Sequence, residues 1–135
     1  MDVTLPDAAR TLLDASHVAV LATTNPDGSP QSSPVWVGRD GDDVLISTAA
    51  GRRKTVNLER DARASVTVWD PADPEAYVEV RGTATVTEDP GRALAVALGD
   101  KYGGPGHGAE YLALPPEVVR VVVRITPTRV VVVVG

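Results

Sequence analysis

Short runs rich in β-branched and other apolar residues, separated by proline and glycine, dominate the chain. This arrangement is typical of strands joined by tight turns. The runs cover residues 17–24, 29–37, 44–48, 62–69 and 76–87, and two further valine-rich runs, 118–126 and 128–134, flank Pro127. We expect about seven strands, with a break at Pro127, and mostly antiparallel pairing because many connections have the length of a hairpin turn.

Three segments have the signals of short helices. Residues 6–15 begin with a proline and an aspartate, and a second helix is expected from Arg52 to about Arg60. Residues 89–102 begin with Asp89 as a candidate cap and Pro90 at the first helical position. The strands outweigh these helices, so we expect a mainly β fold, a closed or nearly closed β-barrel with a few short peripheral helices.

Composition limits the class of protein. The chain has 135 residues, 43% of them hydrophobic, and we expect a single domain over residues 1–135. It has neither the roughly 18 to 20 continuous apolar residues of a membrane helix nor the regions of a signal peptide, so we expect a soluble, cytoplasmic protein without membrane contact. The chain has no cysteine and two histidines, which excludes thiolate chemistry and argues against a metal site.

Charge is distributed unevenly. The net charge of −5 and the pI near 4.9 argue against a nucleic-acid partner. Within this acidic chain, however, the stretch 51–66 holds five of the thirteen cations, which are Arg52, Arg53, Lys54, Arg60 and Arg63. Because the cluster is confined to one short stretch, we expect its partner to be a small anion.

The position of the cluster makes the anion a specific prediction. A strand (44–48), a short loop and a helix follow one another, so the first turn of the helix carries cations where the helix dipole already places positive charge. A phosphate would balance them, since arginine forks, a lysine, hydroxyls and free amides all bind it. The expected phosphate ligands are Ser47, Thr48, Arg52, Arg53, Lys54 and Asn57. The alternative is a solvated helix whose cations pair with Glu59 or Asp61, and we assign Arg60 and Arg63 to that role.

Other candidate motifs have simpler explanations. The glycine-rich stretch 103–108 follows a helix and lacks the context of a dinucleotide-binding fingerprint, so we expect a surface loop there. Ser32 and Ser33 lack the surroundings of a nucleophile. We expect Arg120 and Arg124, on one face of a late strand, to be solvated; the alternative is that they reach a subunit interface or the acidic tail of a cofactor.

Three stretches, "VAVLATTNPDGSPQSSPVWV", "VLISTAAGRRKTVNLERDARASVTV" and "AYVEVRGTATVTED", resemble the flavin and deazaflavin oxidoreductases related to pyridoxamine 5'-phosphate oxidase. The similarity runs from about residue 5 to the C-terminus and is greatest to the branch that uses coenzyme F420. It implies an FMN-binding type of split β-barrel and a homodimer with the cofactor in a cleft between the subunits. The long C-terminal extension of true pyridoxamine-phosphate oxidases is missing, so that activity is not expected.

The resemblance also implies roles for individual residues. The six expected phosphate ligands named above would hold the phosphate end of the cofactor. The second strand would lie along its ring system through Gln31, Ser33, Pro34 and Val35, and the other subunit would cover the site with Trp69 and Tyr77. In this family, loops such as 103–108 border the substrate cleft, so the resemblance makes Tyr102 and His107 candidate substrate contacts. No catalytic residue is assigned, and no metal is expected.

The expected function is therefore hydride transfer from reduced F420 to a small organic acceptor. Two alternatives share the phosphate site: an FMN-binding oxidoreductase of the same fold, and a carrier that binds F420, FMN or a tetrapyrrole without turnover. The residues alone do not distinguish the two ring systems.

Overall fold

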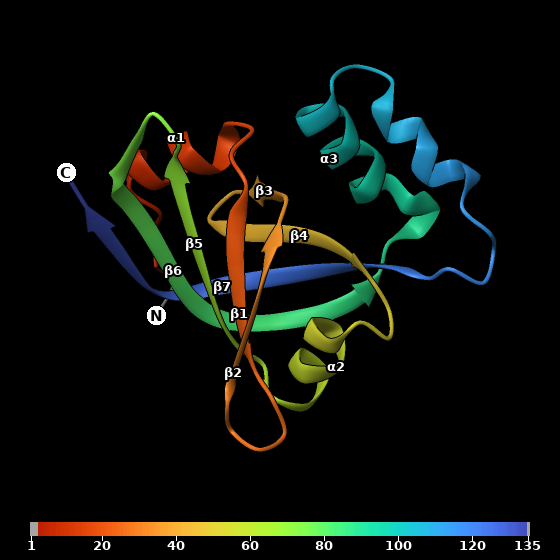
Figure 1. Cartoon of the computed structure of the whole chain (residues 1–135), viewed down its shortest axis with the longest axis horizontal. Helices are drawn as coiled ribbons and strands as arrows, with labels where there is room; N and C mark the ends of the chain where they lie inside the picture. The colour runs from red at the N-terminus through yellow and green to blue at the C-terminus, as the bar shows by residue number, and fades with distance from the viewer. Residues whose placement is uncertain (1–2, 135) are drawn as a thin grey trace.

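The computed structural model describes residues 3–134, and its strands form one seven-stranded antiparallel sheet in the order β2-β1-β5-β6-β7-β4-β3 (Figure 1). The strands are β1 (Ala19–Thr24), β2 (Pro30–Val35), β3 (Val37–Asp40), β4 (Asp43–Ala49), β5 (Arg63–Asp70), β6 (Asp73–Glu88) and β7 (Arg120–Val133). The mainly β class and the antiparallel pairing predicted from the sequence are confirmed.

The two ends of the sheet order are consecutive in the chain. β2 pairs with β1, and after the single residue Trp36 the chain continues as β3, which pairs with β4. The sheet therefore curls back on itself, which gives the split barrel that the sequence predicts. Residues 29–37 are thus not one strand, and the stretch 38–43, which the sequence indicates as a turn, contains most of β3.

Pro127 does not break the last strand, contrary to the sequence-based expectation. β7 runs through it, and the register with β6 shifts there, because Gly82 pairs with Pro127 and Arg81 pairs with Arg129. Thr128 is the extra residue of a β-bulge, a place where a strand accommodates a proline without losing its continuity. The backbones approach closely, since a β-carbon on Gly82 would lie 2.1 Å from the carbonyl oxygen of Thr126.

The barrel interior holds the hydrophobic core. Side chains that alternate along each strand are excluded from solvent there; Leu21, Ile46, Val66, Val80 and Val123 have no exposed surface. Helix α1 (Asp7–Asp14) adds Ala9 and Leu13 to this cluster. Alternate residues of the same strands face outward, and on the side of β4 and β2 they form part of the candidate site.

The expected helices are present, with one addition. α2 is Arg53–Arg60, and the third segment divides into the 3-10 turn η1 (Pro90–Arg92) and α3 (Ala93–Gly103). Pro90 begins η1 and not α3, whose N-cap position is Arg92, contrary to the prediction. Asp89 nevertheless caps α3 with its side chain, because the carboxylate accepts hydrogen bonds of 3.0 Å from the N–H groups of Leu94 and Ala95. No helix in the described part of the chain is long and apolar enough to cross a membrane.

The addition is a second 3-10 helix, η2 (His107–Ala113), where the sequence predicts only a surface loop. η2 packs against α3 through Gly108, whose N–H donates to Asp100 Oδ1 (2.7 Å). A β-carbon on Gly108 would lie 2.0 Å from the carbonyl oxygen of Val96, so only glycine permits this approach. Together α3 and η2 form a unit at one end of the molecule, away from the tip of the β5–β6 hairpin (Figure 1).

Candidate functional site

A pocket of about 330 Å³ lies where this helical unit meets the barrel. Its apolar wall comes from the end of β2 and from α3, and the residues that form it are Val18, Pro34, Val35, Trp36, Ala95 and Leu98. Its polar side comes from β4, α2, η2 and β7, which contribute Ser47, Lys54, Tyr111 and Arg120. The pocket thus combines an apolar surface with a cationic end.

Arg120, the first residue of β7, is the central group of the cationic end. Its Nη2 donates a hydrogen bond to Ser47 Oγ (2.8 Å), and its guanidinium lies 4.9 Å from the centroid of the Tyr111 ring. Its Nε is buried and has no hydrogen-bond partner. An unpaired buried N–H on a charged group is unfavourable, and an anion in the pocket would relieve it.

Lys54, in the first turn of α2, lies at the same end of the pocket. Burial lowers the pKa of Lys54 below its ordinary value, and the charges of Arg52 and Arg120 lower it further. Burial likewise lowers the pKa of Arg120 below its ordinary value. Tyr111 and Asp89 oppose this shift, and the charges of Arg52 and Arg92 add smaller lowering contributions. The cations therefore repel one another, as the helix-terminus argument anticipates.

No carboxylate neutralises these groups. Among residues 3–134 the ion pairs to acidic side chains use Arg10, His17, Arg39, Arg63, Arg81 and Arg124, and none uses Arg52, Lys54 or Arg120. Asp89 favours the charged form of Arg120, but both of its oxygens already accept hydrogen bonds from α3. Within residues 3–134, the cations at the pocket end therefore form no ion pair with a carboxylate.

The predicted phosphate ligands divide into two groups. Ser47 and Lys54 line the pocket, and the exposed Arg52 acts on it through its charge. Arg53 is exposed and does not line the pocket, while Thr48 is 5% exposed and faces the barrel interior.

Asn57 lies on the buried side of α2. Its Nδ2 donates to Thr23 Oγ1 and to Asn25 Oδ1, both at 3.0 Å, and its Oδ1 accepts from Arg60 (3.3 Å). Thr23 Oγ1 in turn donates to Gln31 Oε1 (2.6 Å). The amide of Asn57 therefore fastens α2 to the β1–β2 hairpin, and Arg60, expected to be solvated, takes part in the same network.

The four residues predicted to lie along the cofactor ring do not all line the pocket. Pro34 and Val35 line the pocket, whereas Gln31 belongs to the network under α2. Ser33 pairs with Leu21 across β1, and its buried Oγ has no hydrogen-bond partner. Because β2 is the edge of the sheet and pairs on one side only, backbone groups on its other side are available to a ligand.

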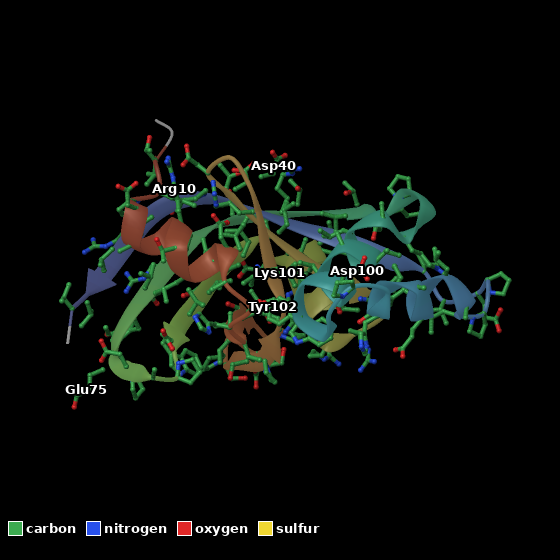
Figure 2. All side chains as sticks on the ribbon, turned by 90° about the horizontal axis from the view of Figure 1, so that it is seen from above. Arg10, Asp40, Glu75, Asp100, Lys101 and Tyr102 are labelled. Carbon is green, nitrogen blue, oxygen red and sulfur yellow. The ribbon has the colours of Figure 1, made fainter. Side chains whose placement is uncertain are left out.

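Trp69 and Tyr77 do not lie at the pocket. They are opposite each other on β5 and β6, near the hairpin whose tip carries Glu75 (Figure 2), and 38% of Tyr77 is exposed. Neither is among the residues that line the pocket, and their contact with a cofactor, expected from a second copy of the chain, stays a prediction.

Tyr102, a candidate substrate contact, is instead part of the scaffold. Its ring stacks on Trp36 with centroids 4.9 Å apart, and its hydroxyl donates to the His17 carbonyl (2.7 Å) and accepts from the Val37 N–H (3.0 Å). Lys101 donates to the carbonyls of Leu13 and Val37, both at 2.6 Å. Figure 2 shows these two residues where the end of α3 meets the barrel. They fix the helix, and thereby one wall of the pocket.

Sequence reasoning missed Tyr111 and placed Arg120 in solvent. Arg124 does pair at the surface with Asp40 and Asp43, but Arg120 does not. Its proximity to Ser47 arises from the β4–β7 pairing, in which Ala49 is opposite Arg120 and Ser47 opposite Val122. Alternation along β7 indicates the face but not the partner strand, so the sequence contains no local signal for this contact.

Comparisons with known proteins identify the family and the fold. A sequence model of the pyridoxamine 5'-phosphate oxidase family matches residues 5–133. A solved structure described as an F420 reductase is 29% identical, superposes with a TM-score of 0.77, and the alignment covers 94% of this chain and 98% of that one. A conserved hypothetical protein of Mycobacterium tuberculosis is 27% identical with a TM-score of 0.77, over 98% and 86% of the two chains.

More distant structures share the fold alone. HupZ of Group A Streptococcus is 15% identical, with a TM-score of 0.71 over 98% of this chain and 100% of that one. The architecture therefore extends well beyond the sequences that resemble this chain.

Proposed function

The chain belongs to the pyridoxamine 5'-phosphate oxidase family, and from this premise we propose that it is an oxidoreductase whose pocket binds the phosphate of a flavin-type cofactor. Coenzyme F420 is the proposed cofactor, and FMN is the alternative. The observation that supports the proposal is the cationic pocket end, where Arg120 has a buried, unpaired Nε beside Ser47 and Lys54.

The donor set fits a phosphate. Arg120 offers a guanidinium held in place by Ser47 and Tyr111, and Lys54 offers an ammonium group. The first turn of α2 adds unpaired backbone N–H groups and the charge of the helix dipole. In a partly buried site, hydrogen bonds between these cations and phosphate oxygens are stronger than those between neutral groups. Arg52 and Arg53 extend the cationic surface toward solvent.

The preference for F420 rests on similarity. The solved structure described as an F420 reductase matches this chain over almost its whole length. The cationic end would serve the phosphate of FMN equally well, so the choice between the two cofactors needs an experiment.

The apolar wall would accommodate the ring system. Pro34 and Val35 lie at the edge strand β2, whose unpaired backbone side can donate to and accept from polar ring atoms. Gln31 and Ser33 remain proposed ring contacts on the same strand, and Thr48 and Asn57 remain proposed members of the phosphate site. We further propose a homodimer, in which Trp69 and Tyr77 of a second copy would cover the cleft.

When bound, a reduced cofactor of this type supplies a hydride to a small organic acceptor. The residues of this chain bind the phosphate, orient the ring against β2 and exclude water with α3 and η2. In this proposal solvent provides the proton that completes the product, with Tyr77 of a second copy as the candidate side chain.

Turnover tests the proposal. The purified protein would be mixed anaerobically with reduced F420, or separately with reduced FMN, and a series of small organic acceptors, while the absorbance of the oxidised cofactor is recorded. Acceptor-dependent oxidation that a Lys54→Met variant loses would support the proposal. Tight binding without turnover would identify a carrier instead, and the absence of both would refute the proposal.

A further inference from the structure

Arg92 has an unusual backbone for an arginine. Its φ of 57° and ψ of 30° are left-handed, and it is the one residue other than glycine with a positive φ among residues 3–134. The β-carbon makes this conformation unfavourable unless other interactions hold it. Gly91 before it is also left-handed, with φ 64°, and the N–H of Arg92 donates to the Asp89 carbonyl (2.9 Å). The resulting turn comes directly before α3.

The side chain of Arg92 holds the segment between η2 and β7. Its Nη1 donates to the carbonyls of Tyr111 (2.9 Å) and Leu114 (2.8 Å), and its Nη2 donates to those of Pro115 (2.7 Å) and Val118 (3.0 Å). One guanidinium thus donates to four carbonyls of a segment outside the sheet, and two of them, Tyr111 and Pro115, also accept a backbone N–H from within the segment. We call Arg92 and these four carbonyls the Arg92 clamp.

The clamp holds the backbone close to two residues at the cationic end of the pocket, Tyr111 and Arg120. It holds the backbone of Tyr111 directly, and it holds Val118 shortly before Arg120. The Asp89 N–H also donates to the Arg120 carbonyl (2.9 Å), so the turn that presents Arg92 is joined to the start of β7. Arg92 itself does not line the pocket.

We propose that Arg92 is a positioning residue for the anion site: by clamping the 111–118 segment it sets the Tyr111 ring beneath the Arg120 guanidinium and so preorganises Arg120 for the phosphate. This inference rests on the proposed function. If only the positive charge of Arg92 mattered, its left-handed backbone and its hydrogen bonds to four carbonyls would not be needed. A residue that acts by holding the segment in place needs both.

Two substitutions separate geometry from charge. Arg92→Gly keeps the left-handed turn, because glycine adopts it without strain, and removes the clamp together with the positive charge of Arg92. Arg92→Lys keeps the positive charge but cannot donate to four carbonyls in a fork. With inorganic pyrophosphate as the probe, measured by titration calorimetry, we expect both variants to bind about tenfold more weakly than the wild type. Wild-type affinity in either variant would overturn the inference.

A double-mutant cycle tests the route through Tyr111. In the wild-type background, Tyr111→Leu should weaken pyrophosphate binding severalfold, because the ring under Arg120 is lost. In the Arg92→Gly background the same substitution should have little further effect, since the ring is no longer held in place. Additive losses would show that Arg92 acts on binding independently of the Tyr111 ring, and would overturn the inference.

Arg39→Gln is the matched control. Arg39 also holds its surroundings with three hydrogen bonds, to both carboxylate oxygens of Asp14 and to the Gly41 carbonyl, but on another side of the barrel. We expect it to change thermal stability and leave pyrophosphate affinity unaltered.

Hydrogen exchange provides a readout without ligand, and Arg92→Gly should accelerate exchange in residues 107–118. A wild type that binds no pyrophosphate would refute the proposed function itself, and the role of Arg92 with it.

Discussion

Arg120 on β7 donates a 2.8 Å hydrogen bond to Ser47 on β4, so a residue near the end of the chain is joined to the hydroxyl that precedes the basic helix α2. This bond brings the strand cation and the helix cation Lys54 into one pocket. An acidic chain therefore contains a cationic site assembled from segments that are far apart in sequence. Each prediction below tests one consequence of that arrangement.

Removal of Lys54 should weaken anion binding without unfolding the protein. One charge-assisted contact is worth about 1.5 to 3 kcal/mol, so Lys54→Ala should raise the Kd for the cofactor by roughly 10- to 150-fold. Arg53→Ala, at an exposed position that does not line the pocket, should have a smaller effect. Fluorescence titration gives the affinities and thermal melting checks the fold. Equal affinity in the wild type and in Lys54→Ala would refute the phosphate site.

Anion binding should weaken at alkaline pH. Burial, then Arg52 and Arg120, lowers the pKa of Lys54 below its ordinary 10.5. The free protein loses this proton before an unfolded chain would, so the contribution of Lys54 to stability rises with pH through that window. A bound anion favours the charged lysine, so affinity should fall over the same range. Sulfate, titrated at constant ionic strength, keeps its own charge there. Lys54→Met should bind more weakly and abolish this pH dependence, and an unchanged profile would contradict the assignment to Lys54.

Asn57→Ala should distinguish two roles for this residue. If Asn57 mainly fastens α2 to the β1–β2 hairpin, its removal leaves Thr23 and Asn25 short of a donor and lowers the free energy of unfolding by about 1 to 3 kcal/mol. Urea unfolding measures that loss. A large fall in cofactor affinity at full stability would instead show that the amide contacts the phosphate, as the sequence suggests.

Gly108→Ala should disrupt the packing of η2 on α3. A β-carbon there would lie 2.0 Å from the backbone oxygen of Val96, which cannot move without distorting α3, and we expect a loss of about 3 kcal/mol or more. Gly41→Ala provides the comparison, because Gly41 has a φ of 60° but open space around its β-carbon position. It should cost only about 1 to 2 kcal/mol of backbone strain. Equal losses in urea unfolding would mean that the contact with Val96 is unimportant.

Local patterns predicted a large part of this molecule. The strands and helices follow from short runs, prolines and caps, and Asp89 does cap α3. Lys54 and Ser47 could be assigned to one site because a strand, a loop and a helix N-terminus are consecutive in the chain. The cap and the helix N-terminus depend on neighbours within a few residues, which a sequence displays directly.

The remainder depends on pairing between distant segments. Pro127 looks like a strand break until the bulge opposite Gly82 is known. Arg120 looks solvated until β7 is placed beside β4, and η2 brings Tyr111 beneath it through the close approach at Gly108. Asn57 follows Lys54 by about one helical turn, which suggests a ligand, and only the structure shows the hydrogen bonds of its amide to the hairpin. No periodicity in the sequence specifies these contacts.

The most direct test is an equilibrium titration of the purified protein with F420 and, separately, with FMN, at low and high salt. Trp36 lines the pocket and Trp69 is the other tryptophan, so tryptophan fluorescence reports binding, and Trp69→Phe leaves Trp36 as the sole reporter. We predict saturable quenching that is tighter for F420 than for FMN, and that both salt and Arg120→Met weaken. Tighter binding of FMN would change the proposed cofactor. Binding of neither, or an affinity that Arg120→Met leaves unaltered, would contradict the claim that this cationic pocket end holds a cofactor phosphate.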